Sequence, residues 1–136
     1  MRKRPELVKT PLDTILLLHG MMVMSDFKNE AEAAVLQTFL KTLPEFRMED
    51  IEELQGKVAE IRAEYPSAKD SIAALAKISS EVVRKKTFIL ALDIAMASGA
   101  IDATEDDLLE DLRIVLGIKL ETAETILDVL AVKYAT

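Results

Sequence analysis

Residues 10–24 read TPLDTILLLHGMMVM, and their apolar side chains cover almost the whole circumference of the helix that they are expected to form. A second stretch, residues 86–97, reads KTFILALDIAMA and is also strongly apolar. A surface helix has its apolar side chains on one face only, whereas a helix that is apolar all round is buried. We therefore expect these two segments to lie at the centre of a helical bundle and to pack against each other.

Capping signals divide the rest of the sequence into short helices. Thr10 with Asp13 three residues later is typical of a helix start, and Thr104 is expected to cap a later helix. Gly99 and Gly117 are expected to end the two helices that precede them. The helices expected from these signals cover about residues 11–24, 30–43, 49–65, 68–78, 86–97, 104–116 and a last segment around 126–132. No segment alternates with a period of two over a useful length, so the sequence predicts an all-α fold.

Composition limits the class of protein further. The 136 residues fit one domain, expected to span 1–136 with a flexible tail over 1–9, and half of them are hydrophobic. The absence of cysteine excludes disulfides, thiolate zinc sites and cysteine nucleophiles, and we expect a cytoplasmic protein. A net charge of −7 repels phosphate, and the basic runs 2–4 and 84–86 are short, so nucleic-acid binding is not predicted. The apolar run 15–24 is shorter than the ~20 residues of a membrane span.

Two similar acidic turns follow the two apolar segments and form a weak internal repeat of one helical hairpin. The first turn, residues 25–32, reads SDFKNEAE, and the second, residues 97–105, reads ASGAIDATE. The stretch from Ile94 to Ile118 resembles the tellurite-resistance TerB family, whose fold is shared with the amino-terminal domain of DjlA-type co-chaperones. Gly99, Ile101, Glu105 and residues 116–118 (Leu-Gly-Ile) match the family motif, while Ser98 stands in the place of its aspartate. In the first turn Asp26 matches, Phe27 replaces the glycine, and Glu30 or Glu32 is nearest to the glutamate position.

The resemblance implies a TerB-like bundle, a role in tellurite or other stress responses, and a divalent-cation site at the acidic turns. The candidate metal ligands are Asp26, Glu30, Glu32, Asp102 and Glu105. Independently of the family, clustered carboxylates supply the oxygens that calcium or magnesium requires, although this spacing is not that of an EF-hand. In the competing interpretation, the acids only complement the positive end of a helix dipole. The two turns form one negative patch if they share an end of the bundle, and separate caps if they do not.

Two polar residues stand out within the apolar segments. His19 is the only histidine, and we expect it to be buried and hydrogen-bonded. Asp93 lies among apolar residues, where an unpaired carboxylate is costly, so it is expected to pair with His19 or with a lysine unless it lines a site. No catalytic motif surrounds either residue. We therefore expect a non-catalytic interaction module that binds a protein partner through an acidic surface. The alternatives are a metal-ion sensor or sequestering protein, and a hydrolytic or redox enzyme that uses His19 and Asp93.

Overall fold

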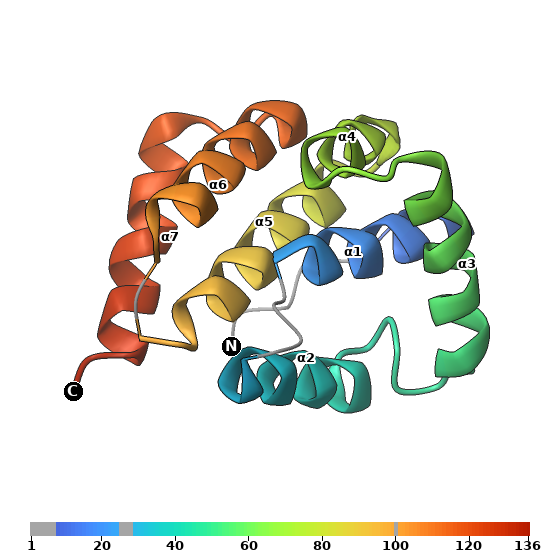
Figure 1. Ribbon diagram of the computed structural model, residues 1–136, viewed down its shortest axis with the longest axis horizontal. Coiled ribbons are helices and arrows are strands. Elements are labelled where there is room, and N and C mark those ends of the chain that lie inside the picture. Colours follow the sequence, from blue (N-terminus) through green and yellow to red (C-terminus); the bar gives the residue numbers. More distant parts are fainter. Residues whose placement is uncertain (1–7, 25–28, 100) are drawn as a thin grey trace.

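The computed structural model describes residues 8–24, 29–99 and 101–136, and these residues form helices joined by short turns, with no strand. The elements are α1 (Pro11–Met24), α2 (Glu30–Thr42), α3 (Ile51–Glu64), α4 (Ala68–Ala73), the short 3-10 helix η1 (Ala74–Lys77), α5 (Glu81–Met96), α6 (Ala103–Leu116) and α7 (Leu120–Lys133) (Figure 1). The expected all-α, single-domain helical bundle is confirmed. Most of the tail expected over residues 1–9 lies outside the described residues.

α1 and α5 form the centre of the bundle, as their apolar circumference predicted. They pack against each other more extensively than any other pair of elements, and Figure 1 shows them crossing between α3 on one side and α6 and α7 on the other. Leu16, Leu17 and Leu18 of α1 and Ile94 of α5 are almost completely buried. The crossing is close at Gly20 of α1, which faces Thr87 of α5.

The start of α1 is fixed by a capping box that also reaches a distant segment. The Asp13 amide donates to Thr10 Oγ1 at 3.1 Å, and the Thr10 amide donates to Asp13 Oδ2 at 3.3 Å. The same carboxylate accepts from the Ser79 amide and the Ser79 hydroxyl, both at 2.8 Å. Burial alone would raise the pKa of Asp13, but these hydrogen bonds outweigh it and lower the pKa below its ordinary value. Asp13 therefore joins the beginning of α1 to the segment that leads into α5.

Several of the predicted helix boundaries are wrong. α7 begins at Leu120 rather than near residue 126, and the expected helix over 68–78 is divided into α4 and η1. α5 begins at Glu81 rather than Lys86, because the Ser80 side chain caps it by accepting from the Val83 amide. α6 is capped by Asp102 rather than Thr104, because Asp102 forms a capping box with the glutamate three residues later. α5 ends before Gly99, which has φ +91° in the turn beyond it. Gly117 does end α6 in the left-handed conformation, as predicted.

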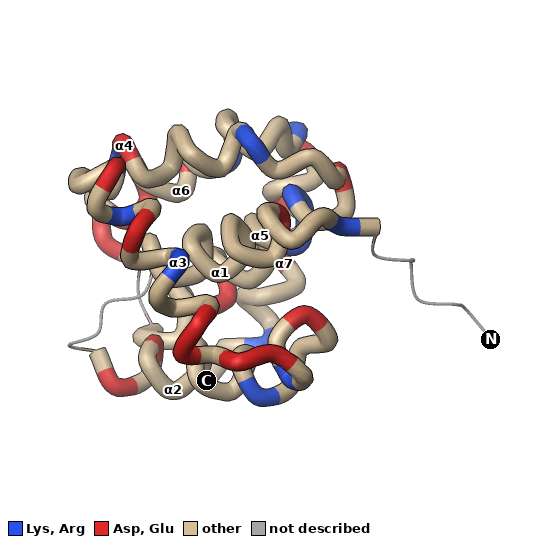
Figure 2. The backbone as a smooth tube through the Cα atoms, turned by 90° about the vertical axis from the view of Figure 1, so that its right-hand side faces the viewer, with Lys and Arg blue, Asp and Glu red and all other residues tan. Residues whose placement is uncertain are grey.

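Charged residues are spread over the surface helices, with acidic segments on the α3 side of the molecule (Figure 2). Glu49, Asp50, Glu52 and Glu53 are all exposed, and Asp50 caps α3 by accepting from the two amides of Glu52 and Glu53. These four acids therefore form a solvated helix start, as expected. Among the described residues, none of the helices has the length and apolar character needed to cross a membrane.

Candidate functional site

The two acidic turns of the sequence meet at one hollow of about 310 Å³. The hollow lies where the end of α1 and the start of α2 face the end of α5 and the start of α6. It is lined by Val23, Met24, Asn29, Glu32, Ser98, Asp102, Glu105 and Leu108. Acids that are some seventy positions apart in the sequence thus share one end of the bundle, which is the arrangement that a negative patch requires.

The two helix starts at this hollow are built in the same way. Asn29 caps α2 by accepting from the Glu32 amide at 3.1 Å, and Asp102 caps α6 by accepting from the Glu105 amide at 2.8 Å. In both helices a glutamate therefore stands three residues after the capping residue. From the sequence, either Glu30 or Glu32 could be the counterpart of Glu105. Because Glu32 lies three residues after Asn29, as Glu105 lies three residues after Asp102, Glu32 is the counterpart.

The predicted metal ligands differ in where they lie. Glu32 is only 2 % exposed, Glu105 is half-buried, and Asp102 is exposed. Glu30 is exposed and does not line the hollow. Asp26 lies outside the described residues. Within the part of the chain that the structure describes, no three acidic or histidine residues form a group that could hold a metal ion.

His19 and Asp93 are not paired with each other. His19 is fully buried, and its Nε2 donates to the Ser71 carbonyl at 3.0 Å, while Nδ1 has no hydrogen-bond partner among the residues that the structure describes. Burial lowers the pKa of His19 below its ordinary value, although the hydrogen bond to Ser71 acts in the opposite direction.

Asp93 instead accepts from Lys133 Nζ at 2.8 and 2.9 Å and from the Tyr134 hydroxyl. The prediction of a buried, paired Asp93 is confirmed with a lysine as the partner, and the pairing with His19 is wrong. Lys133 and Tyr134 stand at the end of α7, so we call this group the α5–α7 clamp. Burial alone would lower the pKa of Lys133, but the hydrogen bonds to Asp93 and Tyr134 raise it.

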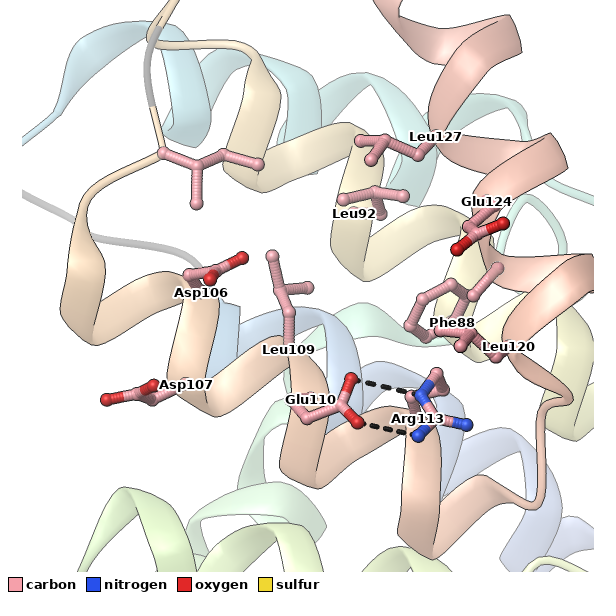
Figure 3. A pocket seen from close by; sticks show the side chains of 12 residues that line it. Phe88, Leu92, Asp106, Asp107, Leu109, Glu110, Arg113, Leu120, Glu124 and Leu127 are labelled. Carbon is pink, nitrogen blue, oxygen red and sulfur yellow. Dashed lines mark hydrogen bonds and ion pairs between the residues drawn. The ribbon is translucent and has the colours of Figure 1, made fainter.

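A second concave region, which the sequence did not reveal, lies between α5, α6 and α7 and has a volume of about 410 Å³ (Figure 3). We call it the α5–α7 groove. Its apolar lining consists of Phe88, Leu92, Ile101, Leu109, Leu120, Ala123 and Leu127. Four carboxylates stand around the apolar lining, those of Asp106, Asp107, Glu110 and Glu124. The groove thus combines an apolar floor with a strongly acidic rim.

Among the described residues, Arg113 is the one cation that lines the groove, and its guanidinium is already hydrogen-bonded. Its Nε and Nη2 donate to Glu110 at 3.0 and 2.6 Å, and its Nη1 donates to the Ile118 carbonyl at 2.9 Å. The hydrogen bonds from Arg113 lower the pKa of Glu110, and the same bonds raise the pKa of Arg113. Asp106, Asp107 and Glu124 therefore dominate the charge that the groove presents to a ligand.

The sequence did carry one signal for this groove. α7 has apolar residues beyond those that its buried face needs, and Leu120 and Leu127 remain 56 % and 42 % exposed. Single exposed apolar residues are common on protein surfaces and carry no message by themselves. Leu120 and Leu127 form part of a groove only because α5 and α6 place further apolar side chains beside them, and this is visible only in the tertiary structure.

In comparisons with known proteins, no family model, no curated protein and no solved structure matches this chain. The resemblance to the TerB family therefore rests on the motif residues of the sequence alone.

Proposed function

We propose that this chain is a non-catalytic, TerB-like interaction module that works in the cytoplasm in a stress response such as tellurite resistance. In this proposal, it acts by binding a protein partner through an acidic surface. The observation that carries the proposal is the α5–α7 groove, in which apolar side chains are surrounded by carboxylates. Protein interfaces have the same organisation, with an apolar centre that becomes fully buried and a polar rim that stays wet.

Exposed apolar surface in such a groove lowers the free energy of a complex when a partner covers it. Burial of apolar area is favourable by roughly 25 cal/mol per Å². The acidic rim adds specificity, because a partner with the wrong charge is repelled.

Site-specific crosslinking in the native host tests this function. A photo-crosslinking amino acid at Leu120, which lines the groove, should give a discrete covalent product with a partner protein. The same amino acid at Ala59, an exposed residue of α3 on the opposite flank of the bundle, serves as the control. Glu124→Lys should abolish the product formed from position 120. Identical products from both positions, or none from position 120, would contradict a functional groove. Tellurite tolerance of a strain that lacks the gene tests the kind of stress.

The second candidate function is the binding of a divalent cation, calcium or magnesium, at the hollow between the acidic turns. The specific observation in its favour is that Glu32, Asp102 and Glu105 line one hollow although they come from two distant turns. Hard cations bind carboxylate oxygens, although the described acids do not by themselves form a group of three that could hold an ion. The cation would either tune the interaction module or, in a sensor or sequestering protein, be the cargo itself.

A thermal-shift series with calcium, magnesium, manganese and zinc separates these functions, because a ligand that binds only the native state raises Tm by mass action. We expect a rise with calcium or magnesium that Glu32→Gln abolishes. Glu60→Gln, which removes a charge from an exposed position of α3, should leave the rise unchanged. A Tm that none of the four ions shifts would exclude the cation site and leave the groove proposal intact.

A further inference from the structure

The size of the α5–α7 groove limits what can occupy it. A volume of about 410 Å³ between three helices accommodates several large side chains but not a whole helix, whose diameter with side chains is about 10–12 Å. An occupant therefore lies across the groove and inserts side chains from one of its faces. An amphipathic helix does this, because residues at i, i+3, i+4 and i+7 project from one side.

The charge around the groove limits the occupant further. Asp106 comes from the first turn of α6, Asp107 follows it, and Glu124 comes from α7 across the groove. Arg113 does not offset these acids for an incoming ligand, because its guanidinium already holds Glu110 and the Ile118 carbonyl. The groove is thus apolar between two negative walls. An anionic lipid surface or a nucleic acid would be repelled there, and a cationic partner would be attracted.

A second copy of this chain fits the groove poorly. Its net charge is −7, so two copies would bring acidic surfaces together and would be repelled over a distance of about a Debye length, ~10 Å in ordinary buffers. A partner of opposite charge gains from the same field in its rate of association. Charge complementarity therefore selects another protein over self-association.

We propose that the α5–α7 groove binds an amphipathic helix of a partner protein, with large apolar residues along one face and lysine or arginine residues on both flanks. The apolar residues would contact the exposed side chains of Leu120 and Leu127 above the buried floor of the groove, and the flanking cations would meet Asp106, Asp107 and Glu124. This inference rests on the proposed function as an interaction module, and it adds the chemistry of the partner.

Titration with designed peptides tests the inference directly. The probe is a capped peptide of about 15 residues, long enough for some helix in water, with leucines at i, i+4 and i+7 and lysines on both flanks. One matched peptide replaces every lysine by glutamate, and another replaces every leucine by alanine. We expect saturable binding of the leucine–lysine peptide and at least ~10-fold weaker binding of the glutamate peptide. The alanine peptide should not bind measurably, since the apolar contact supplies most of the free energy.

Protein variants locate the binding on the groove. Glu124→Lys should weaken binding of the lysine peptide by about 5- to 10-fold. Glu60→Lys on α3 makes the same change of net charge away from the groove and should have little effect on this binding. Both residues are exposed, so both variants should fold, which circular dichroism verifies. The methyl signals of Leu92, Leu109 and Leu127 should shift on titration.

Several outcomes would overturn the inference. These are equal binding of the lysine and glutamate peptides, equal effects of the two charge reversals, signal changes confined to other helices, or a concentration-dependent dimer that uses the groove. Such a result together with a specific crosslink from Leu120 would reject the basic helix as the partner and leave the interaction function standing. Peptide binding at the groove without any crosslink in the host would reject the interaction function instead.

Discussion

Gly20→Ala should destabilise the protein, although alanine is the better residue for a helix. A Cβ at this position of α1 would lie 2.5 Å from Thr87 Cγ2 of α5 and 3.4 Å from Leu75 Cδ1. Thr87 cannot simply turn its methyl group away, because its hydroxyl donates to the Val83 carbonyl at 2.7 Å and both groups share one χ1 angle. The two central helices must therefore move apart or lose this hydrogen bond.

The magnitude follows from two opposing effects. Replacing glycine by alanine in a helix interior stabilises it by up to about 1 kcal/mol, whereas forcing an extra carbon into a packed core costs about 1–3 kcal/mol or more. We expect the free energy of unfolding to fall by about 1–2 kcal/mol. Gly56 provides the matched control, because it lies in the interior of α3 with no atom within 4 Å of the added Cβ. Gly56→Ala should therefore raise the free energy of unfolding by about 0.5–1 kcal/mol.

Urea denaturation followed by circular dichroism measures both effects, and a double-mutant cycle identifies their cause. Thr87→Ser removes the methyl group and keeps the hydroxyl that bonds to Val83. The variant that combines Gly20→Ala with Thr87→Ser should be more stable than the sum of the single changes predicts. If Gly20→Ala stabilises the protein as Gly56→Ala does, or if the cycle shows no coupling, α1 and α5 do not cross this closely and the reasoning is refuted.

Two further predictions concern the buried polar residues. Asp93→Ala should lower the free energy of unfolding by about 1–3 kcal/mol in the same urea assay, since it leaves the Tyr134 hydroxyl and Lys133 unpaired; Asp93→Leu should cost less, because it refills the space. The pKa of Lys133 is raised in the folded state, so the contribution of the clamp is complete below its unfolded pKa of about 10.5 and is lost as the pH rises through the folded value. The pKa of His19 is lowered instead, so its neutral form stabilises the fold above pH ~6.5, and stability should fall by up to ~1.4 kcal/mol per pH unit on acidification. His19→Gln keeps a donor toward Ser71 without a titrating group. If the free energy of unfolding of this variant falls on acidification as steeply as that of the original protein, His19 is excluded as the cause.

The helical fold was predictable because its determinants are local or depend on simple patterns. Helix caps such as that of Thr10 and Asp13 involve residues three positions apart, and the buried position of α1 and α5 follows from their apolar circumference. One error occurred where two capping residues compete. Asp102 and Thr104 both suit a helix start, and the glutamate at 105 decides for Asp102 because it lies three residues after it.

The sites were less predictable because they depend on tertiary contacts. The sequence suggested two acidic turns but could not decide whether they share an end, since this depends on the directions of four helices. It offered His19 or a lysine as the partner of Asp93 without identifying Lys133, which is 40 residues away in the sequence. The α5–α7 groove was missed because exposed leucines in α7 become a surface feature only beside Leu92 and Leu109.

The walls of the groove are fixed at both ends of α7, and this gives the groove a shape before any partner arrives. At the end of α7, Lys133 joins the helix to Asp93 of α5. Before its start, Arg113 of α6 donates to the Ile118 carbonyl in the turn between α6 and α7. In a preformed groove, α7 need not be ordered when a partner binds, so less conformational entropy is lost and the affinity is higher. In the proposed function, the α5–α7 clamp would thus serve binding as well as stability, because a loose α7 would give the groove no constant width.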